Sequence, residues 1–134
     1  MPPRTVWLVD DDLLFTARLE SQLRASGFAV QSFDNGEELP WPAERPDCVV
    51  VNFGAASDDR AAVVRRLKSE PGLPSIPVLA FAGHLETERH RRARAAGADK
   101  VVANSAIKSR AVELIEITIA RVTSGAPIDD TVDE

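Results

Sequence analysis

The chain has 134 residues, of which 44% are apolar and 28% charged, shares that are ordinary for a folded domain with a single core. A net charge of −5 at pH 7 argues against attraction of the whole surface to nucleic acid or anionic membrane. No apolar run has the length of a signal peptide or a membrane span, so we expect a cytoplasmic protein without a membrane partner. The single cysteine, Cys48, lies in an apolar run, which favours a small core residue over a nucleophile or metal ligand.

Short apolar segments alternate along the chain with longer segments of helical periodicity. This alternation is typical of a parallel sheet covered by helices on both faces. The predicted strands are residues 5–10, 28–33, 48–52, 76–81 and 100–104, and the predicted helices are residues 12–26, 59–69, 86–96 and 108–122. We therefore expect a doubly wound, five-stranded α/β domain over residues 1–122 and a flexible, acidic tail over residues 123–134.

The segment between the second and third strands breaks the alternation. A helix is expected there, but Pro40 and Pro42 each remove a backbone donor and clash with the preceding turn. At most one helical turn can form, so the second helix of the fold is predicted to be shortened. Trp41, between the two prolines, is expected to pack against the core in its place, and an exposed contact residue is the alternative.

Ligands of doubly wound domains bind at the carboxyl ends of the strands, so the residues that end strands are the candidates for function. They are Asp10, Asp11 and Asp12 after the first strand, Asn52 after the third, Ala82 and Gly83 after the fourth, and Asn104 after the fifth. Asp12 is also a plausible N-cap of the first helix. Asn52 can donate a hydrogen bond to the neighbouring aspartates and so ease their mutual repulsion.

Four segments around these strand ends carry a family resemblance. They are "VWLVDDD", "PDCVVVNF", "IPVLAFAG" and "AGADKVVANS", in that order along the chain. Together they resemble the receiver domain of bacterial response regulators, over about residues 4 to 122. The resemblance implies a flavodoxin-like fold and a pocket in which a carboxylate accepts a phosphoryl group with the help of Mg²⁺, a hydroxyl and a lysine.

Several positions of that pocket depart from the family pattern. The phosphoacceptor position holds Asn52, whose amide cannot form an acyl phosphate. Ala82 stands at the hydroxyl position and Asn104 at the lysine position. Val101 stands where the family often has an aromatic residue that changes rotamer, and it is too small to act in that way. The resemblance therefore implies an atypical receiver, a pseudo-receiver, that aspartyl phosphate does not switch.

The acidic pair Asp10 and Asp11 is all that remains of the family's metal site. Without a third carboxylate, Mg²⁺ would keep most of its waters and bind weakly. We favour a structural cluster at the strand end over a cation site, and we expect no other cofactor. No combination of nucleophile, base and oxyanion donors can be assembled from the strand ends, so no catalytic residue and no enzymatic activity are predicted.

The predicted helix 86–96 carries four arginines, Arg89, Arg91, Arg92 and Arg94, in an otherwise acidic protein. They spread around most of the helix and leave Leu85, Ala93 and Ala96 as a narrow inward stripe. His84 and His90 are expected at the surface. In the resembled family this helix belongs to the face that meets partners, so the arginines and Val101 are candidate partner contacts. A solvated helix face is the alternative.

These observations predict a phosphorylation-independent module of a signalling assembly that acts by binding a protein. Its partner face would comprise the helix 86–96, the fifth strand and the last helix, and a homodimer stays open. One alternative is a nucleic-acid-associated regulator that binds through the arginines, in which case binding should weaken steeply with salt. A weaker alternative is a receiver with a residual response to divalent cations or phosphate.

Overall fold

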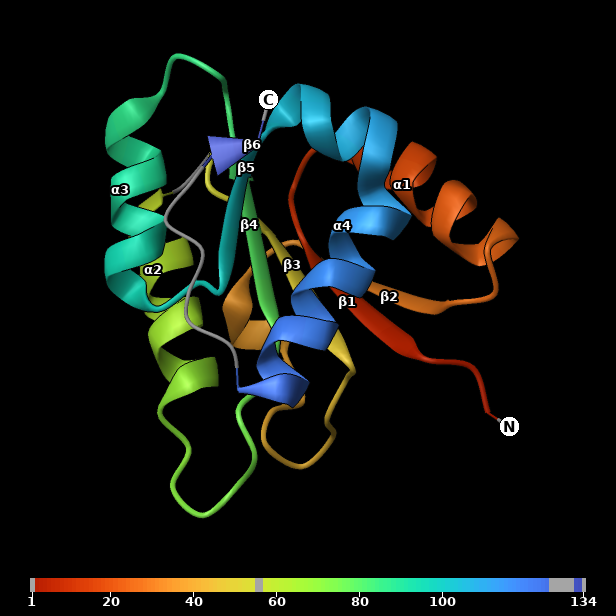
Figure 1. The fold of residues 1–134 in the computed structure, drawn as a ribbon, viewed down its shortest axis with the longest axis vertical. Coiled ribbons are helices and arrows are strands. Elements are labelled where there is room, and N and C mark those ends of the chain that lie inside the picture. The colour runs from red at the N-terminus through yellow and green to blue at the C-terminus, as the bar shows by residue number, and fades with distance from the viewer. Residues whose placement is uncertain (1, 55–56, 126–131, 134) are drawn as a thin grey trace.

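The computed structural model describes residues 2–54, 57–125 and 132–133. Its centre is a parallel sheet with the strand order β2-β1-β3-β4-β5-β6 (Figure 1). The strands are β1 (Thr5–Val9), β2 (Ala29–Phe33), β3 (Cys48–Asn52), β4 (Val78–Ala82), β5 (Lys100–Ala103) and the two-residue β6 (Val132–Asp133). The predicted five-stranded doubly wound sheet is confirmed. The short β6, which pairs in parallel with β5, is an addition that the sequence did not indicate.

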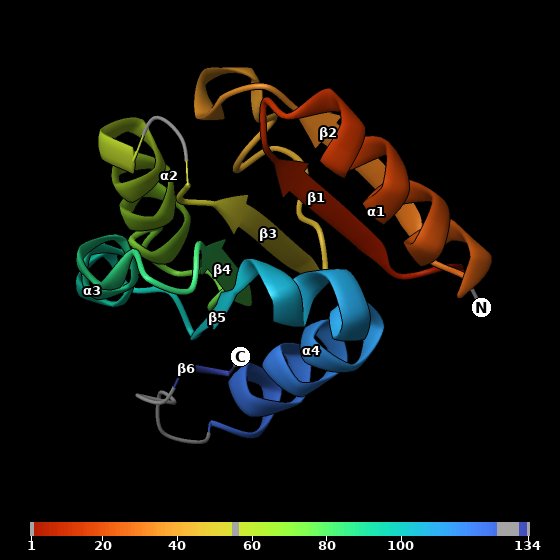
Figure 2. The same ribbon diagram turned by 90° about the horizontal axis from the view of Figure 1, so that it is seen from above.

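In the described part of the chain, four α-helices cover the two faces of the sheet. They are α1 (Leu13–Ala25), α2 (Ser57–Lys68), α3 (Thr87–Ala96) and α4 (Asn104–Ser124). Seen from above, α1 and α4 lie on one face and α2 and α3 on the other (Figure 2). The central strands are buried on both faces, which explains why they read as continuous apolar runs. No helix among the described residues is long and apolar enough to cross a membrane.

Alternate residues of each strand supply two separate core layers. In β1, Trp7 and Val9 face α2 and α3, whereas Val6 and Leu8 face α1 and α4. This period of two is the normal consequence of the β pleat. Cys48 is buried in the layer under α1 and α4, and burial raises the pKa of its thiol, as expected for a small core residue that is unreactive.

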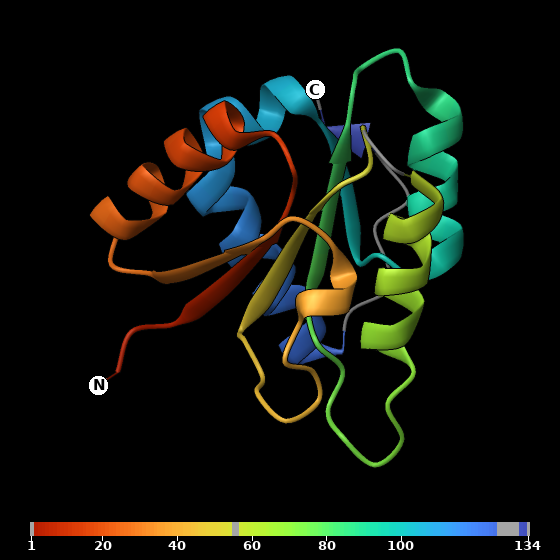
Figure 3. The ribbon, with the colours of Figure 1, turned by 180° about the vertical axis from the view of Figure 1, so that it is seen from behind.

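The shortened second helix is confirmed. A single 3-10 turn, η1 (Gly36–Glu38), stands in its place and lies beside α2 (Figure 3). Trp41 is buried in the core layer under α2 and α3, as predicted. The Arg66 guanidinium of α2 donates to the carbonyl oxygens of Gly36 at 3.1 Å and of Trp41 at 2.6 Å, so it holds the segment that the prolines keep from forming a helix.

The last helix differs from the prediction at both of its ends. It begins at Asn104 and not near residue 108, because an initial helical segment joins the main one at Arg110, whose φ of −137° and ψ of 29° are not helical. It ends at Ser124, so the first two residues of the predicted tail are helical. Residues 126–131 and 134, the larger part of that tail, lie outside the described residues.

Candidate functional site

The carboxyl ends of β1 and β3 bring Asp10 and Asn52 into direct contact. Asn52 Nδ2 donates to Asp10 Oδ1 at 2.9 Å, as the sequence predicted, and Asn52 Oδ1 accepts from the Gly54 amide at 2.7 Å. Both ends of the Asn52 side chain are therefore engaged within the loops that follow these strands. An amide fits this position because it can donate to a carboxylate and accept from a backbone N–H at the same time.

Asp10 is 5% exposed, and its carboxylate is only partly satisfied. Its Oδ1 also accepts from the Asp12 amide at 3.0 Å, whereas the buried Oδ2 has no hydrogen-bond partner among the described residues. Burial raises the pKa of Asp10 above its ordinary value, although the hydrogen bonds from Asp12 and Asn52 oppose the rise. Asp12 accepts from the Phe15 amide at 3.1 Å and so confirms its predicted role as the N-cap of α1.

Arg60 of α2 is a buried cation beside this cluster. Its side chain is 1% exposed and its Nη2 lies 3.7 Å from Asp11 Oδ1, while the Asp11 side chain is 52% exposed. Arg60 Nη2 also donates to the Asp34 carbonyl oxygen at 3.0 Å, but Nε and Nη1 are buried without a hydrogen-bond partner. Arg60 was not predicted from the sequence. The helical spacing of Arg60 with the inward residues Val63, Val64 and Leu67 could have indicated that it faces the core.

These residues do not fit a site for Mg²⁺. The ion prefers several oxygen ligands in octahedral geometry, most of all carboxylates. Here the Asn52 oxygen already accepts a backbone hydrogen bond, and Asp11 faces the guanidinium of Arg60. Within the part of the chain that the structure describes, no three His, Cys, Asp or Glu side chains form a group that could hold a metal ion.

A second network ties the loop after β3 to the loop after β4. Glu86 Oε1 accepts from the Gly83 amide at 2.7 Å, and Glu86 Oε2 lies 2.9 Å from Arg89 Nε. Arg89 Nη1 then donates to the Phe53 carbonyl oxygen at 3.0 Å. Sequence reasoning missed Glu86, because its role depends on the path of two loops. Arg89, predicted as a partner contact, is instead a half-buried internal donor.

Val101 and Arg94, two further predicted partner contacts, are less exposed than predicted. Val101 is 1% exposed and packs in the core layer under α2 and α3, so a partner cannot reach its side chain in this conformation. Arg94 is half-buried, and its Nε is buried without a hydrogen-bond partner. Arg91 is 73% exposed and pairs with Glu88 at 2.7 Å, on the outer side of α3, and Arg92 is half-buried.

The predicted inward stripe of α3 was wrong at one position and incomplete at another. Leu85 precedes the helix and is 85% exposed, because α3 begins only at Thr87. His90, expected at the surface, is buried and lies 2.9 Å from the Gly83 carbonyl oxygen through Nε2. The stripe therefore consists of His90, Ala93 and Ala96.

The remaining strand-end residues, Ala82 and Asn104, add no hydrogen bond to the Asp10–Asn52 contact. Ala82 is fully buried at the end of β4 and offers no hydroxyl. Asn104 is the first residue of α4, and its side-chain oxygen is buried without a hydrogen-bond partner. Among the described residues, the hydrogen-bond partners of Asp10 and Asn52 do not include Asn104, so the five residues predicted as one pocket do not form one connected polar network.

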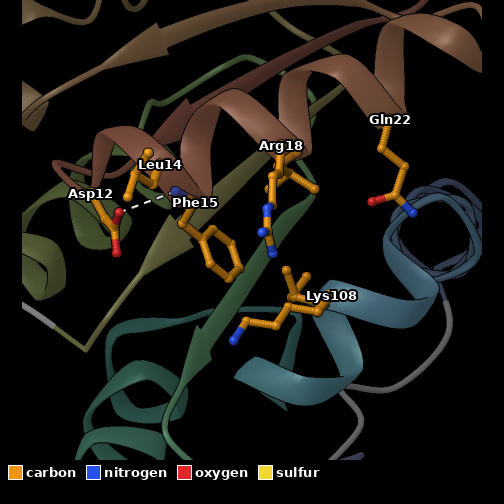
Figure 4. Close-up of a pocket in the computed structure, with 8 residues that line it drawn as sticks. Asp12, Leu14, Phe15, Arg18, Gln22 and Lys108 are labelled. Atoms are coloured by element: carbon orange, nitrogen blue, oxygen red, sulfur yellow. Dashed lines mark hydrogen bonds between the residues drawn. The ribbon is translucent and has the colours of Figure 1, made fainter.

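A groove of about 440 Å³ opens between α1 and the first turns of α4 (Figure 4). Arg18 and Lys108 point into it from opposite helices, and Phe15 forms its floor by stacking on Phe81 with 5.2 Å between ring centroids. Of the acidic residues at the end of β1, only Asp12 lines this groove. The groove is thus separate from the Asp10–Asn52 cluster.

Comparisons with known proteins agree with this architecture. The sequence matches the model of the response regulator receiver domain over residues 6–116. It is 29% identical over 120 residues to the gliding motility regulatory protein of Myxococcus xanthus and 26% identical over 117 residues to the DNA-binding transcriptional regulator NtrC of Salmonella typhimurium. These matches cover 88% and 86% of this chain but only 15% and 24% of the two relatives.

Solved structures show the same fold. A putative response regulator from Chloroflexus aurantiacus superposes with a TM-score of 0.79 at 24% identity, covering 89% of this chain and 99% of that one. A response regulator receiver protein from Burkholderia phymatum gives a TM-score of 0.69 at 25% identity, covering 93% and 98%.

Proposed function

This chain belongs to the response regulator receiver domain family of signalling modules, and from that premise we propose that it works without aspartyl phosphorylation, as a protein-binding module and not as an enzyme. The observation that carries the proposal is Asn52 at the end of β3. Its amide cannot become an acyl phosphate, and both of its polar atoms are engaged by Asp10 and Gly54. An amide in this position serves to hold the loops together.

The surroundings of Asn52 support the same proposal. Ala82 offers no hydroxyl, and Val101 is a buried β-branched residue with a restricted side-chain rotamer. Glu86 and Arg89 link the loops after β3 and β4 into one hydrogen-bonded unit. A conformational switch needs an element with two alternative arrangements. This hydrogen-bonded network favours a single arrangement of the two loops.

The absence of phosphotransfer is directly testable. We expect that incubation with phosphoramidate and Mg²⁺ adds no phosphoryl group to the protein, as measured by intact mass under native conditions, while a receiver domain with an acceptor aspartate is modified in parallel. A phosphoryl group that is gained by the wild type and lost in Asp10→Asn or Asp11→Asn would contradict the proposal, because it would place an acceptor on the surviving acidic pair.

We further propose that the partner binds the outer side of α3, since the last helix, α4, lies on the opposite face of the sheet. The edge of β5 is less suited than the sequence suggested, because β6 of the same chain pairs with it. Arg91 is the candidate anchor, since it is highly exposed and its weak surface pair with Glu88 can be exchanged for a partner carboxylate. The partner would accordingly be a protein with an acidic surface.

Replacing Arg91 with glutamate is expected to weaken partner capture about tenfold or more, which is the usual effect of losing an anchoring arginine. Arg65→Glu is the matched control, because Arg65 is an exposed arginine on the neighbouring helix α2. Capture from native lysate and sedimentation of the purified proteins would compare the variants, the latter for a homodimer. Equal binding by the Arg91→Glu variant and the wild type would move the interface away from α3.

The nucleic-acid alternative has less support from the geometry. Among the arginines of α3, Arg91 is paired with Glu88 of the same helix and Arg89 with the N-cap residue Glu86. Such pairing reduces the positive potential that a phosphate backbone would meet. Arg89 also donates to the Phe53 carbonyl oxygen, so its guanidinium serves the interior of the domain.

A further inference from the structure

The Glu86 carboxylate is held in a manner typical of a bound oxyanion. One oxygen accepts from the Gly83 amide in the loop after β4, at 2.7 Å, and the other lies 2.9 Å from the Arg89 guanidinium. Backbone N–H groups in loops and a charged arginine fork are the donors that proteins use to bind phosphate and carboxylate groups. At this edge of the sheet the anion is supplied by the chain itself.

Glu86 also lies beside Asn52. A Cβ atom placed on Gly54 would be 2.9 Å from Asn52 Oδ1 and 3.8 Å from Glu86 Oε1, so the two side chains converge on Gly54. A Cβ atom on Gly83 would lie only 2.5 Å from Glu86 Oε1. The carboxylate, whose side chain is 37% exposed, therefore packs closely over Gly83 and lies within ordinary contact distance of Gly54. A side chain at Gly83 would displace Glu86, and one at Gly54 would displace Asn52.

The position of Glu86 in α3 indicates that its side chain serves the loop and not the helix. Glu86 is the N-cap residue of α3, yet its side chain makes no capping hydrogen bond. An N-cap carboxylate ordinarily accepts from a backbone N–H of the first helical turn. Here it turns instead toward Gly83 and Arg89, and through Arg89 it reaches the Phe53 carbonyl oxygen in the loop after β3.

We propose that Glu86 is an internal anion that occupies an oxyanion cradle formed by the Gly83 amide and Arg89 beside Asn52. This inference rests on the proposed function, since it explains how a receiver without a phosphoacceptor holds the loops after β3 and β4 in one arrangement. The cradle is chemically suited to inorganic phosphate or sulfate, but the wild type excludes these ions because Glu86 already fills it. Removal of the carboxylate converts an occupied cradle into an anion-binding site.

The test is thermal unfolding and calorimetric titration with inorganic phosphate, at ionic strength matched with chloride. Glu86→Ser is the principal variant, because serine removes the carboxylate and is a favoured N-cap that supports α3. We expect this variant to be less stable than the wild type and to regain stability saturably with phosphate. At phosphate ten times above its Kd the unfolding equilibrium constant should fall about elevenfold. The wild type should show no saturable response.

Glu88→Ser is the matched control, because Glu88 lies in the first turn of α3 and its partner among the described residues is the exposed Arg91. It should respond to phosphate no more than the wild type. A Glu86→Ser variant that folds but gains no phosphate binding would overturn the inference, as would a wild type that binds phosphate equally well. If Glu86→Ser does not fold, Glu86→Asn is the second variant, because asparagine is a favoured N-cap and its shorter, neutral side chain leaves the cradle open. It should fold and bind phosphate more tightly than the wild type, and failure to do so would also overturn the inference. Covalent phosphoryl transfer to the wild type would instead contradict the proposed function, so the two failures are distinguishable.

Discussion

Replacing Arg60 with alanine is expected to lower the free energy of unfolding by about 3 kcal/mol, whereas replacing it with methionine should change that energy by less than about 1.5 kcal/mol. The alanine variant leaves a cavity where a large side chain, 1% exposed, now packs. Methionine keeps most of the volume and removes the charge. Urea unfolding at neutral pH measures both differences.

The small cost expected for methionine follows from the poor satisfaction of the guanidinium. Arg60 makes one hydrogen bond, to the Asp34 carbonyl oxygen, and two of its nitrogens are buried without partners. Its ion pair with Asp11 is long, at 3.7 Å, and the carboxylate is half exposed to water, which screens the attraction. Loss of that pair is therefore offset by the removal of a buried, poorly solvated charge.

Arg65 provides the control for this comparison. It lies on the exposed side of the same helix, so Arg65→Ala and Arg65→Met should both stay within about 0.5 kcal/mol of the wild type. An Arg60→Met variant that is as unstable as Arg60→Ala would show that the charge of Arg60 stabilises the fold. In that case the contacts with Asp11 and Asp34 would outweigh the desolvation of the guanidinium.

The strand ends could be predicted from sequence because they depend on pattern alone. β3 was predicted with its observed bounds, since a buried parallel strand is a continuous apolar run that ends where polar residues begin. The parallel order then places Asp10 and Asn52 at the same edge of the sheet, and their contact follows from adjacent strands. Pro40 and Pro42 likewise identified the segment that could not form a full helix.

The side chains that complete the site could not be predicted in the same way. Glu86 and Arg89 contact Gly83 and Phe53 through two loops whose path no periodicity specifies. The exposure of Leu85 and the burial of His90 depend on where α3 begins. A different first residue changes which side chains of the helix face the core. The burial of Arg60 could not be predicted because it is a charged residue, and charged residues are rarely buried unless they are paired.

Gly36 gives the second large prediction, because it allows the shortened second helix to approach α2. A Cβ atom on Gly36 would lie 1.9 Å from Val63 Cγ2, a distance at which one of the two side chains must move. Val63 is nearly buried in the core layer beneath α2, and the Gly36 carbonyl oxygen is held by Arg66. We expect Gly36→Ala to lower the free energy of unfolding by about 2 kcal/mol through overpacking.

A double-mutant cycle tests whether this clash with Val63 is the cause. Val63→Ala alone should cost about 2 kcal/mol through the lost burial of two methyl groups, and the double variant should cost less than the sum of the two by about 1 kcal/mol or more. Gly36→Ala combined with Leu23→Ala should be additive, because Leu23 packs on the opposite face of the sheet. Additivity with Val63→Ala would mean that the cost of Gly36→Ala does not come from this clash. The close approach of η1 to α2 would then not depend on the missing side chain.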